Sequence, residues 1–170
     1  MFTQTLLKTA LLAAAATAAS LPARTTTSSF RIAANVTNFD LPTSLQGQEL
    51  TYAPNANCKA DIIFAPAGKG AVFYAAEDTV NVAHFSVGDE TSPLAGLVVT
   101  PGGTATVPSL NTVQLQCETG TSGFVSTNEG LRFEDGYWMA CPRDGSVVLS
   151  FKSAGQRTLA GCADVQLLLV

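Results

Sequence analysis

The feature that most constrains the fold of this chain is the spacing of its short apolar runs. From residue 30 onward, runs of three to eight residues rich in hydrophobic side chains alternate with clusters of Gly, Pro, Asn and Asp. Residues 30–36 (FRIAANV) alternate between apolar and other residues, the period-two pattern of a strand with one buried face. No window after the first twenty residues shows convincing helical spacing. The sequence therefore predicts one all-β domain over residues 30–170, a single-domain antiparallel β-sandwich or barrel.

Two predicted hairpins sharpen this expectation. Asn128-Glu129-Gly130 separates the runs 124–126 and 131–133, and Asp144-Gly145 separates 137–141 from 147–151. Glycine supplies the positive φ that tight hairpin turns require. Another turn is predicted at residues 54–57 (PNAN), where Pro and Asn cluster.

The first twenty residues have the pattern of a secretory signal peptide. One charge at Lys8 precedes an apolar run over 10–16 and small residues over 17–20. The run is shorter than the roughly 20 apolar residues that span a bilayer. Residues 21–29 (LPARTTTSS) are expected to form a flexible polar tail. We therefore expect a secreted protein, located outside the cell or in the cell wall, with no membrane partner.

Four cysteines follow the leader: Cys58, Cys117, Cys141 and Cys162. An even number in an exported chain indicates two disulfides, and sequence alone allows three pairings. We favour Cys141–Cys162, which would join the last strands, and Cys58–Cys117, which would tie the first half of the domain to its middle. Zinc is disfavoured because the chain has no C-x-x-C pair and a single histidine. No metal and no cofactor is expected.

Composition and charge limit the classes of partner. With 46% hydrophobic and 13% charged residues, the chain is typical of a folded domain rather than a disordered one. The formal net charge is −4, and lysines and arginines form no cluster. Nucleic acid is therefore not expected as a partner, because binding phosphates requires concentrated positive charge.

No set of residues predicts a catalytic centre. The only histidine, His84, lies inside a predicted strand, and there is no G-x-S-x-G motif. Glu134 and Asp135 stand beside aromatic residues, but adjacent residues of a strand point to opposite faces. They are more simply interpreted as the polar turn before the next strand. We expect no catalytic residues, and keep a small hydrolase as an alternative.

Two features indicate possible surface sites. Tyr137 and Trp138 are neighbours in a predicted strand, so one of them is expected to face outward, where it could stack on a sugar ring. We favour the other interpretation, which places Trp138 in the core, packed over the Cys141 bridge. Asn35-Val36-Thr37 is an N-glycosylation sequon, used only if it lies on the surface. Whether it is used stays open.

Both ends of the domain resemble a known group of proteins. The segments 136–142 (GYWMACP) and 161–167 (GCADVQL), with an apolar strand between them, resemble the C-terminal half of small secreted fungal proteins that include phialide-type cell-wall proteins. The opening 30–37 (FRIAANVT) is similar to the start of such domains. The resemblance implies an extracellular, wall-associated or host-facing role and transfers no active site.

Together these observations predict a non-enzymatic secreted extracellular or cell-wall protein, effector-like if its producer lives on a host. Its expected partners are cell-wall polysaccharide or a host extracellular protein. The alternative is a carbohydrate-binding module or small hydrolase acting on cell-wall polysaccharide. A third class, an enzyme inhibitor, would use a loop such as 88–93 or 100–104.

Overall fold

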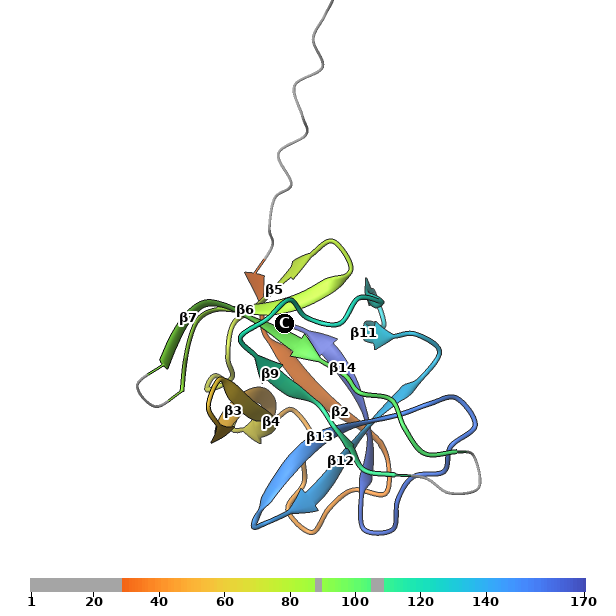
Figure 1. The fold of residues 1–170 in the computed structure, drawn as a ribbon. Helices are drawn as coiled ribbons and strands as arrows, with labels where there is room; N and C mark the ends of the chain where they lie inside the picture. The colour runs from red at the N-terminus through yellow and green to blue at the C-terminus, as the bar shows by residue number, and fades with distance from the viewer. Residues whose placement is uncertain (1–28, 88–89, 105–108) are drawn as a thin grey trace, which may run out of the picture.

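The structure is a computed structural model that describes residues 29–87, 90–104 and 109–170 (Figure 1). The predicted signal peptide (1–20) and residues 21–28 of the predicted tail lie outside the described residues. Ser29, the last residue assigned to that tail, already belongs to a strand. In the described part of the chain, no helix is long and apolar enough to cross a membrane.

The regular structure of the described residues is all β, as predicted. The strands are β1 (Ser29–Phe30), β2 (Ile32–Asn38), β3 (Glu49–Ala56), β4 (Lys59–Ala65), β5 (Phe73–Ala76), β6 (Thr79–Val87), β7 (Glu90–Val98), β8 (Asn111–Thr112), β9 (Gln114–Gln116), β10 (Phe124–Thr127), β11 (Gly130–Phe133), β12 (Tyr137–Arg143), β13 (Ser146–Lys152) and β14 (Ala163–Leu169).

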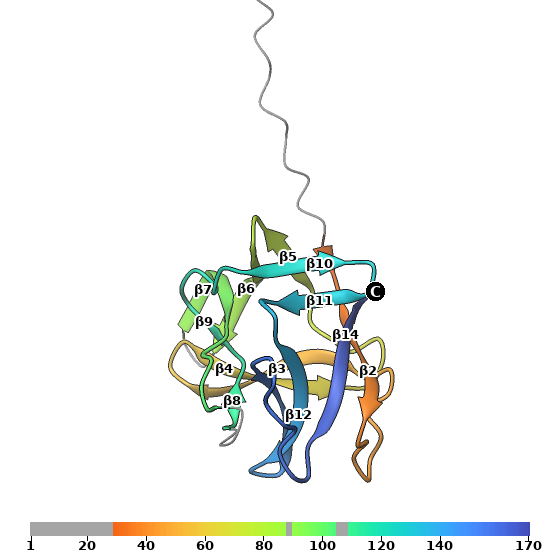
Figure 2. The ribbon, with the colours of Figure 1, turned by 90° about the vertical axis from the view of Figure 1, so that its right-hand side faces the viewer.

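Part of the sheet closes on itself into a barrel. The neighbour order β4–β3–β2–β14–β12–β13 returns to β4, because β13 also pairs with β4 at Val148 and Ile63. All pairings in this ring are antiparallel. Figure 2 shows β2, β14 and β12 side by side along one wall. Of the two predicted architectures, the barrel describes this part of the molecule.

The remaining strands extend the barrel. β9 pairs with β4, and from β9 the sheet continues through β7, β6 and β5 to its edge at β1. The hairpin β10–β11 reaches the ring through the pair Leu131 and Leu167, and Figure 2 shows it crossing above β12 and β14. Hydrophobic residues of the ring, the extension and the hairpin belong to one buried cluster, so the described residues share one main core.

The two predicted hairpins are confirmed. Phe124 pairs with Phe133 and Tyr137 with Lys152, and the turns fall where glycine was expected. Asp144 and Gly145 have φ angles of 48° and 82°. This is the twist that a two-residue hairpin turn needs.

The turn predicted at 54–57 is wrong, because β3 runs through Pro54 to Ala56. The β3–β4 register shifts between these two residues. Such an irregularity lets a strand accommodate a proline, which cannot donate a backbone hydrogen bond. The chain reverses instead around Cys58, whose φ is 54°.

Both predicted disulfides are confirmed. Cys58 is bonded to Cys117 and Cys141 to Cys162, with Cα–Cα distances of 5.3 and 4.4 Å. The Cys141–Cys162 bridge and Met139 form a second buried cluster, against which Leu159 packs.

The prediction that Trp138 lies in the core is confirmed, but the predicted packing over the Cys141 bridge is wrong. Trp138 belongs to the main core, with its ring centroid 5.6 Å from Phe151 and 6.2 Å from Phe124. Met139 and Cys141 belong instead to the cluster around the bridge. Successive residues of a strand point to opposite faces, so Trp138 and Cys141, three positions apart, face opposite ways.

One buried carboxylate holds a turn of the fold. Glu49, at the start of β3, accepts backbone hydrogen bonds from Gly68 and Gly70, both at 2.9 Å. Arg31 lies 3.9 Å away. The bonds from Gly68 and Gly70, and then the charge of Arg31, lower the pKa of Glu49 below its usual value. The ionised form therefore stabilises the folded state.

We expect this carboxylate to make stability depend on pH. Because the pKa of Glu49 is lowered by folding, its contribution is complete above the unfolded-state pKa and is lost as pH falls through the folded-state pKa. The urea midpoint of the wild type should therefore fall between about pH 5 and pH 3, with a smaller fall in Glu49→Gln. Glu77→Gln, on an exposed turn, is the matched control. Identical pH profiles for wild type and Glu49→Gln would contradict the assignment.

Candidate ligand-binding site

The barrel wall formed by β12, β14 and β2 presents one aromatic side chain to solvent. Tyr137 at the start of β12 is 55% exposed, whereas the neighbouring Trp138 is 4% exposed. The Trp138 indole Nε1 donates a hydrogen bond to the Leu131 carbonyl at 2.8 Å. One of the two aromatic residues therefore faces outward, and it is Tyr137.

Tyr137 lines a hollow of about 330 Å³, here called the Tyr137 hollow. Its floor comes from β12 and β14, and one wall from the β10–β11 hairpin. The lining residues are Thr37, Glu129, Leu131, Arg132, Gly136, Tyr137, Trp138, Val165 and Gln166.

Polar residues line part of this hollow. Gln166 donates from Nε2 to the Glu129 carbonyl, and the Thr37 hydroxyl donates to the Asp164 carbonyl at 3.2 Å. Arg132 is exposed on β11. An aromatic face combined with a few fixed hydrogen-bonding groups suits a ligand that has both apolar and polar edges.

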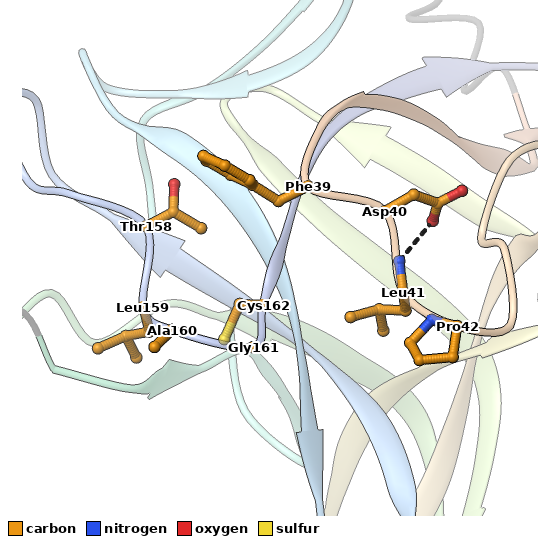
Figure 3. A pocket seen from close by; sticks show the side chains of 9 residues that line it. All are labelled: Phe39, Asp40, Leu41, Pro42, Thr158, Leu159, Ala160, Gly161 and Cys162. Atoms are coloured by element: carbon orange, nitrogen blue, oxygen red, sulfur yellow. Dashed lines mark hydrogen bonds between the residues drawn. The ribbon is translucent and has the colours of Figure 1, made fainter.

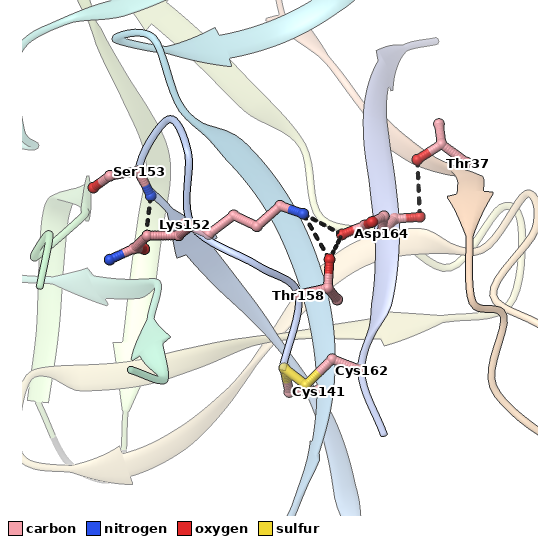
Figure 4. A network of polar contacts seen from close by, with 8 residues as sticks. Thr37, Cys141, Lys152, Ser153, Thr158, Cys162 and Asp164 are labelled. Atoms are coloured by element: carbon pink, nitrogen blue, oxygen red, sulfur yellow. Dashed lines mark hydrogen bonds and ion pairs between the residues drawn. A yellow bond between two sulfur atoms is a disulfide. The ribbon is translucent and has the colours of Figure 1, made fainter. Parts of the chain in front are cut away.

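Lys152 and Asp164 form a partly buried ion pair (Figure 4). Lys152 Nζ is 2.6 Å from Asp164 Oδ1 and 2.7 Å from the Thr158 hydroxyl, which itself donates to Asp164. The same Nζ lies 5.8 Å from the centroid of the Tyr137 ring. Lys152 and Asp164 are on β13 and β14, which flank β12, so the network fixes the strand that carries Tyr137.

A second hollow, of about 350 Å³, lies beside Phe39 (Figure 3). Phe39 is 64% exposed and has a φ of 54°. The hollow lies between residues 39–42 and the segment 158–162 that ends at Cys162, and its lining is mostly apolar. Sequence reasoning missed Phe39, because an apolar residue next to a predicted strand is normally assigned to the core.

Asp40 shapes the loop that presents Phe39. Its Oδ1 accepts hydrogen bonds from the backbone of Leu41 at 2.8 Å and Leu45 at 3.2 Å, and its Oδ2 accepts from the Ser44 hydroxyl at 2.5 Å. The Ser44 bond, followed by the two backbone bonds, lowers the pKa of the Asp40 carboxyl.

The histidine and the two adjacent acids considered from the sequence line neither of the two hollows. His84 is exposed on β6, and Glu134 and Asp135 are exposed in the β11–β12 turn. There the Gly136 amide donates to the Phe133 carbonyl at 3.2 Å. The acids thus occupy the polar turn that we preferred. Among the described residues, no three His, Cys, Asp or Glu side chains gather in a way that could hold a metal ion.

Asn35 lies next to the Tyr137 hollow without lining it. It is half-buried on β2, and its Nδ2 donates to Gln166 Oε1 at 3.1 Å. Thr37, the third residue of the sequon, lines the hollow. The structure therefore brings together the two surface features that the sequence analysis had treated separately.

Fold and disulfides define the class of this protein: a small all-β domain with two disulfides and a partly closed antiparallel sheet. Residues 27–170 match the family described as a domain of unknown function, DUF7907, and the chain belongs to that family. No curated protein and no solved structure matches the chain.

Proposed function

We propose that this chain is a secreted, non-enzymatic extracellular protein that binds cell-wall polysaccharide, with one sugar ring placed on Tyr137. The observation that carries the proposal is the exposure of this aromatic side chain at a hollow lined by both apolar and polar residues. Aromatic residues with an apolar body and a polar tip combine large contact area with hydrogen bonding.

Rigidity supports a binding role for this hollow. Trp138 is held in the core by its indole hydrogen bond, and Lys152 is bonded to Asp164 and Thr158 on the strands around Tyr137. Strands that are already held in place need little ordering when a ligand arrives. The strands that carry the hollow are therefore suited to binding a ligand without backbone rearrangement.

The extracellular part of the proposal has separate support. Two disulfides in a small domain are typical of oxidising compartments outside the cytosol. The signal-peptide pattern of residues 1–20 and the resemblance of both domain ends to small secreted fungal wall proteins agree with this location. In a host-associated producer, the same hollow would face host saccharides and give the protein its effector-like role.

We expect Tyr137→Ala to weaken saccharide binding by at least about tenfold, equivalent to about 1.4 kcal/mol, because truncation of a buried interfacial tyrosine commonly costs that much or more. Tyr137→Phe should retain most of the affinity, since the ring is kept. The probe is an array of β-gluco-, chito- and manno-oligosaccharides, followed by calorimetric titration of the best ligand.

Val125→Ala is the matched control, because Val125 is also 55% exposed but does not line the hollow. Binding that is lost in Phe39→Ala and kept in Tyr137→Ala would move the site to the Phe39 hollow and overturn the proposal. Sugar release by the wild type that disappears in Glu134→Ala would overturn it in favour of the hydrolase alternative.

A further inference from the structure

The sequon on β2 lies in the same cross-strand row as the Tyr137 hollow. Asn35 is directly opposite Gln166 in the β2–β14 register. Trp138 is opposite Val165 in the β12–β14 register, so continuing that register by one residue places Tyr137 opposite Gln166. Both Gln166 and Tyr137 line the hollow. Asn35, Gln166 and Tyr137 therefore follow one another across three neighbouring strands.

The amide of Asn35 is oriented along this row. Its Oδ1 accepts a hydrogen bond from Gln46 Nε2 at 3.1 Å, while its Nδ2 donates to Gln166 Oε1 at 3.1 Å. The nitrogen therefore faces β14 and the hollow beyond it. Two strand spacings, about 10 Å, separate the β2 and β12 backbones, and the side chains of Asn35 and Tyr137 close part of that gap.

We propose that an N-glycan on Asn35 closes the Tyr137 hollow: its first sugar residue lies over Gln166 against the Tyr137 ring and excludes an outside saccharide. The inference rests on the proposed function, because it assigns the regulation of that same site. Binding is then a property of the unglycosylated form, and glycan occupancy at Asn35 sets the fraction of molecules that bind.

The modification itself is compatible with the bonding of Asn35. Transfer from a lipid-linked oligosaccharide diphosphate forms a bond between Nδ2 and the anomeric carbon of the sugar. It breaks the bond from that carbon to the diphosphate and releases one amide proton with the lipid diphosphate. Nδ2 keeps its other hydrogen, so the hydrogen bond to Gln166 can persist after transfer. Thr37, the hydroxyl residue of the sequon, is exposed.

The test compares three forms of the full chain. Wild type is produced in a host that performs N-glycosylation and in an oxidising bacterial compartment that does not, and Asn35→Gln is produced in the first host. Intact mass, before and after peptide N-glycosidase treatment, gives the occupancy of Asn35. The probe is the oligosaccharide of highest affinity on the array. We expect the glycosylated wild type to bind at least about tenfold more weakly than the other two forms. This is the loss expected if the glycan leaves the hollow open less than about a tenth of the time, because the apparent affinity falls with the open fraction.

A second measurement does not depend on any outside ligand. In the glycosylated wild type, NMR should show the protons of the first sugar residue shifted by the Tyr137 ring current, and Tyr137→Ala should abolish that shift. If no form binds a saccharide while the shift is present, the proposed function fails and the placement of the glycan stands. A wild type without glycan from the first host overturns the inference. So does equal binding by glycosylated and unglycosylated forms, which leaves the proposed function intact.

Discussion

Replacing both Cys58 and Cys117 by serine should lower the free energy of unfolding by about 4 kcal/mol. The expected size follows from chain entropy, since the bridge closes a loop with a sequence separation of 59 residues. A change of this size corresponds to a fall in Tm of about 10 °C for a domain of this length. Thermal and urea unfolding of the purified oxidised proteins would measure it.

The position of this bridge gives the loss a structural consequence. Lys59 pairs with Gln116 in the β4–β9 ladder, and the Cys117 amide donates to the Cys58 carbonyl at 3.2 Å. The disulfide therefore fastens the end of the ladder through which β9, β7, β6 and β5 join the barrel. Hydrogen exchange in the double variant should accelerate first in these strands.

The Cys141–Cys162 bridge is the internal comparison. Its sequence separation is 21 residues, so replacing both of its cysteines should cost about 3 kcal/mol on the same reasoning. Exchange should then accelerate in residues 153–162, because Leu159 packs against this bridge and Met139. If neither double variant shifts the unfolding midpoint, the disulfides do not stabilise the domain as argued.

The sequence predicted the local features of this fold well because they depend on local chemistry. Alternation placed Tyr137 and Trp138 on opposite faces, and glycine at positions of positive φ located both hairpin turns. The number of cysteines predicted two disulfides, and the pairing favoured among the three possible ones is the pairing observed. For the faces and the turns, the decisive information lay within a few residues.

Barrel closure and the candidate site could not be predicted in the same way. The barrel closes where Val148 of β13 pairs with Ile63 of β4. The β10–β11 hairpin lies beside the Tyr137 hollow because Leu131 of β11 pairs with Leu167 of β14. Period-two alternation gives the face of a side chain but not the strand beside it. The strand at Pro54 was missed because a bulge, rather than a turn, accommodates the proline.

Trp138→Ala should be among the most destabilising single substitutions, with a loss of about 3–5 kcal/mol in the free energy of unfolding. The indole packs against Phe124 and Phe151, and it holds the β11 backbone through Leu131. The substitution leaves a cavity where the β10–β11 hairpin meets the barrel, and removes the indole partner of the Leu131 carbonyl. Urea unfolding followed by circular dichroism would give the change.

Two further variants separate packing from ligand contact. Trp138→Phe keeps much of the ring but cannot donate to Leu131, so it should cost about 1–3 kcal/mol, as for a buried acceptor left without its partner. Tyr137→Ala should change stability by less than about 1 kcal/mol, since it removes an exposed ring and one weak contact with Lys152. Adjacent residues of β12 would then have opposite roles, with Trp138 required for folding and Tyr137 for binding. A Trp138→Ala protein as stable as the wild type would contradict this division.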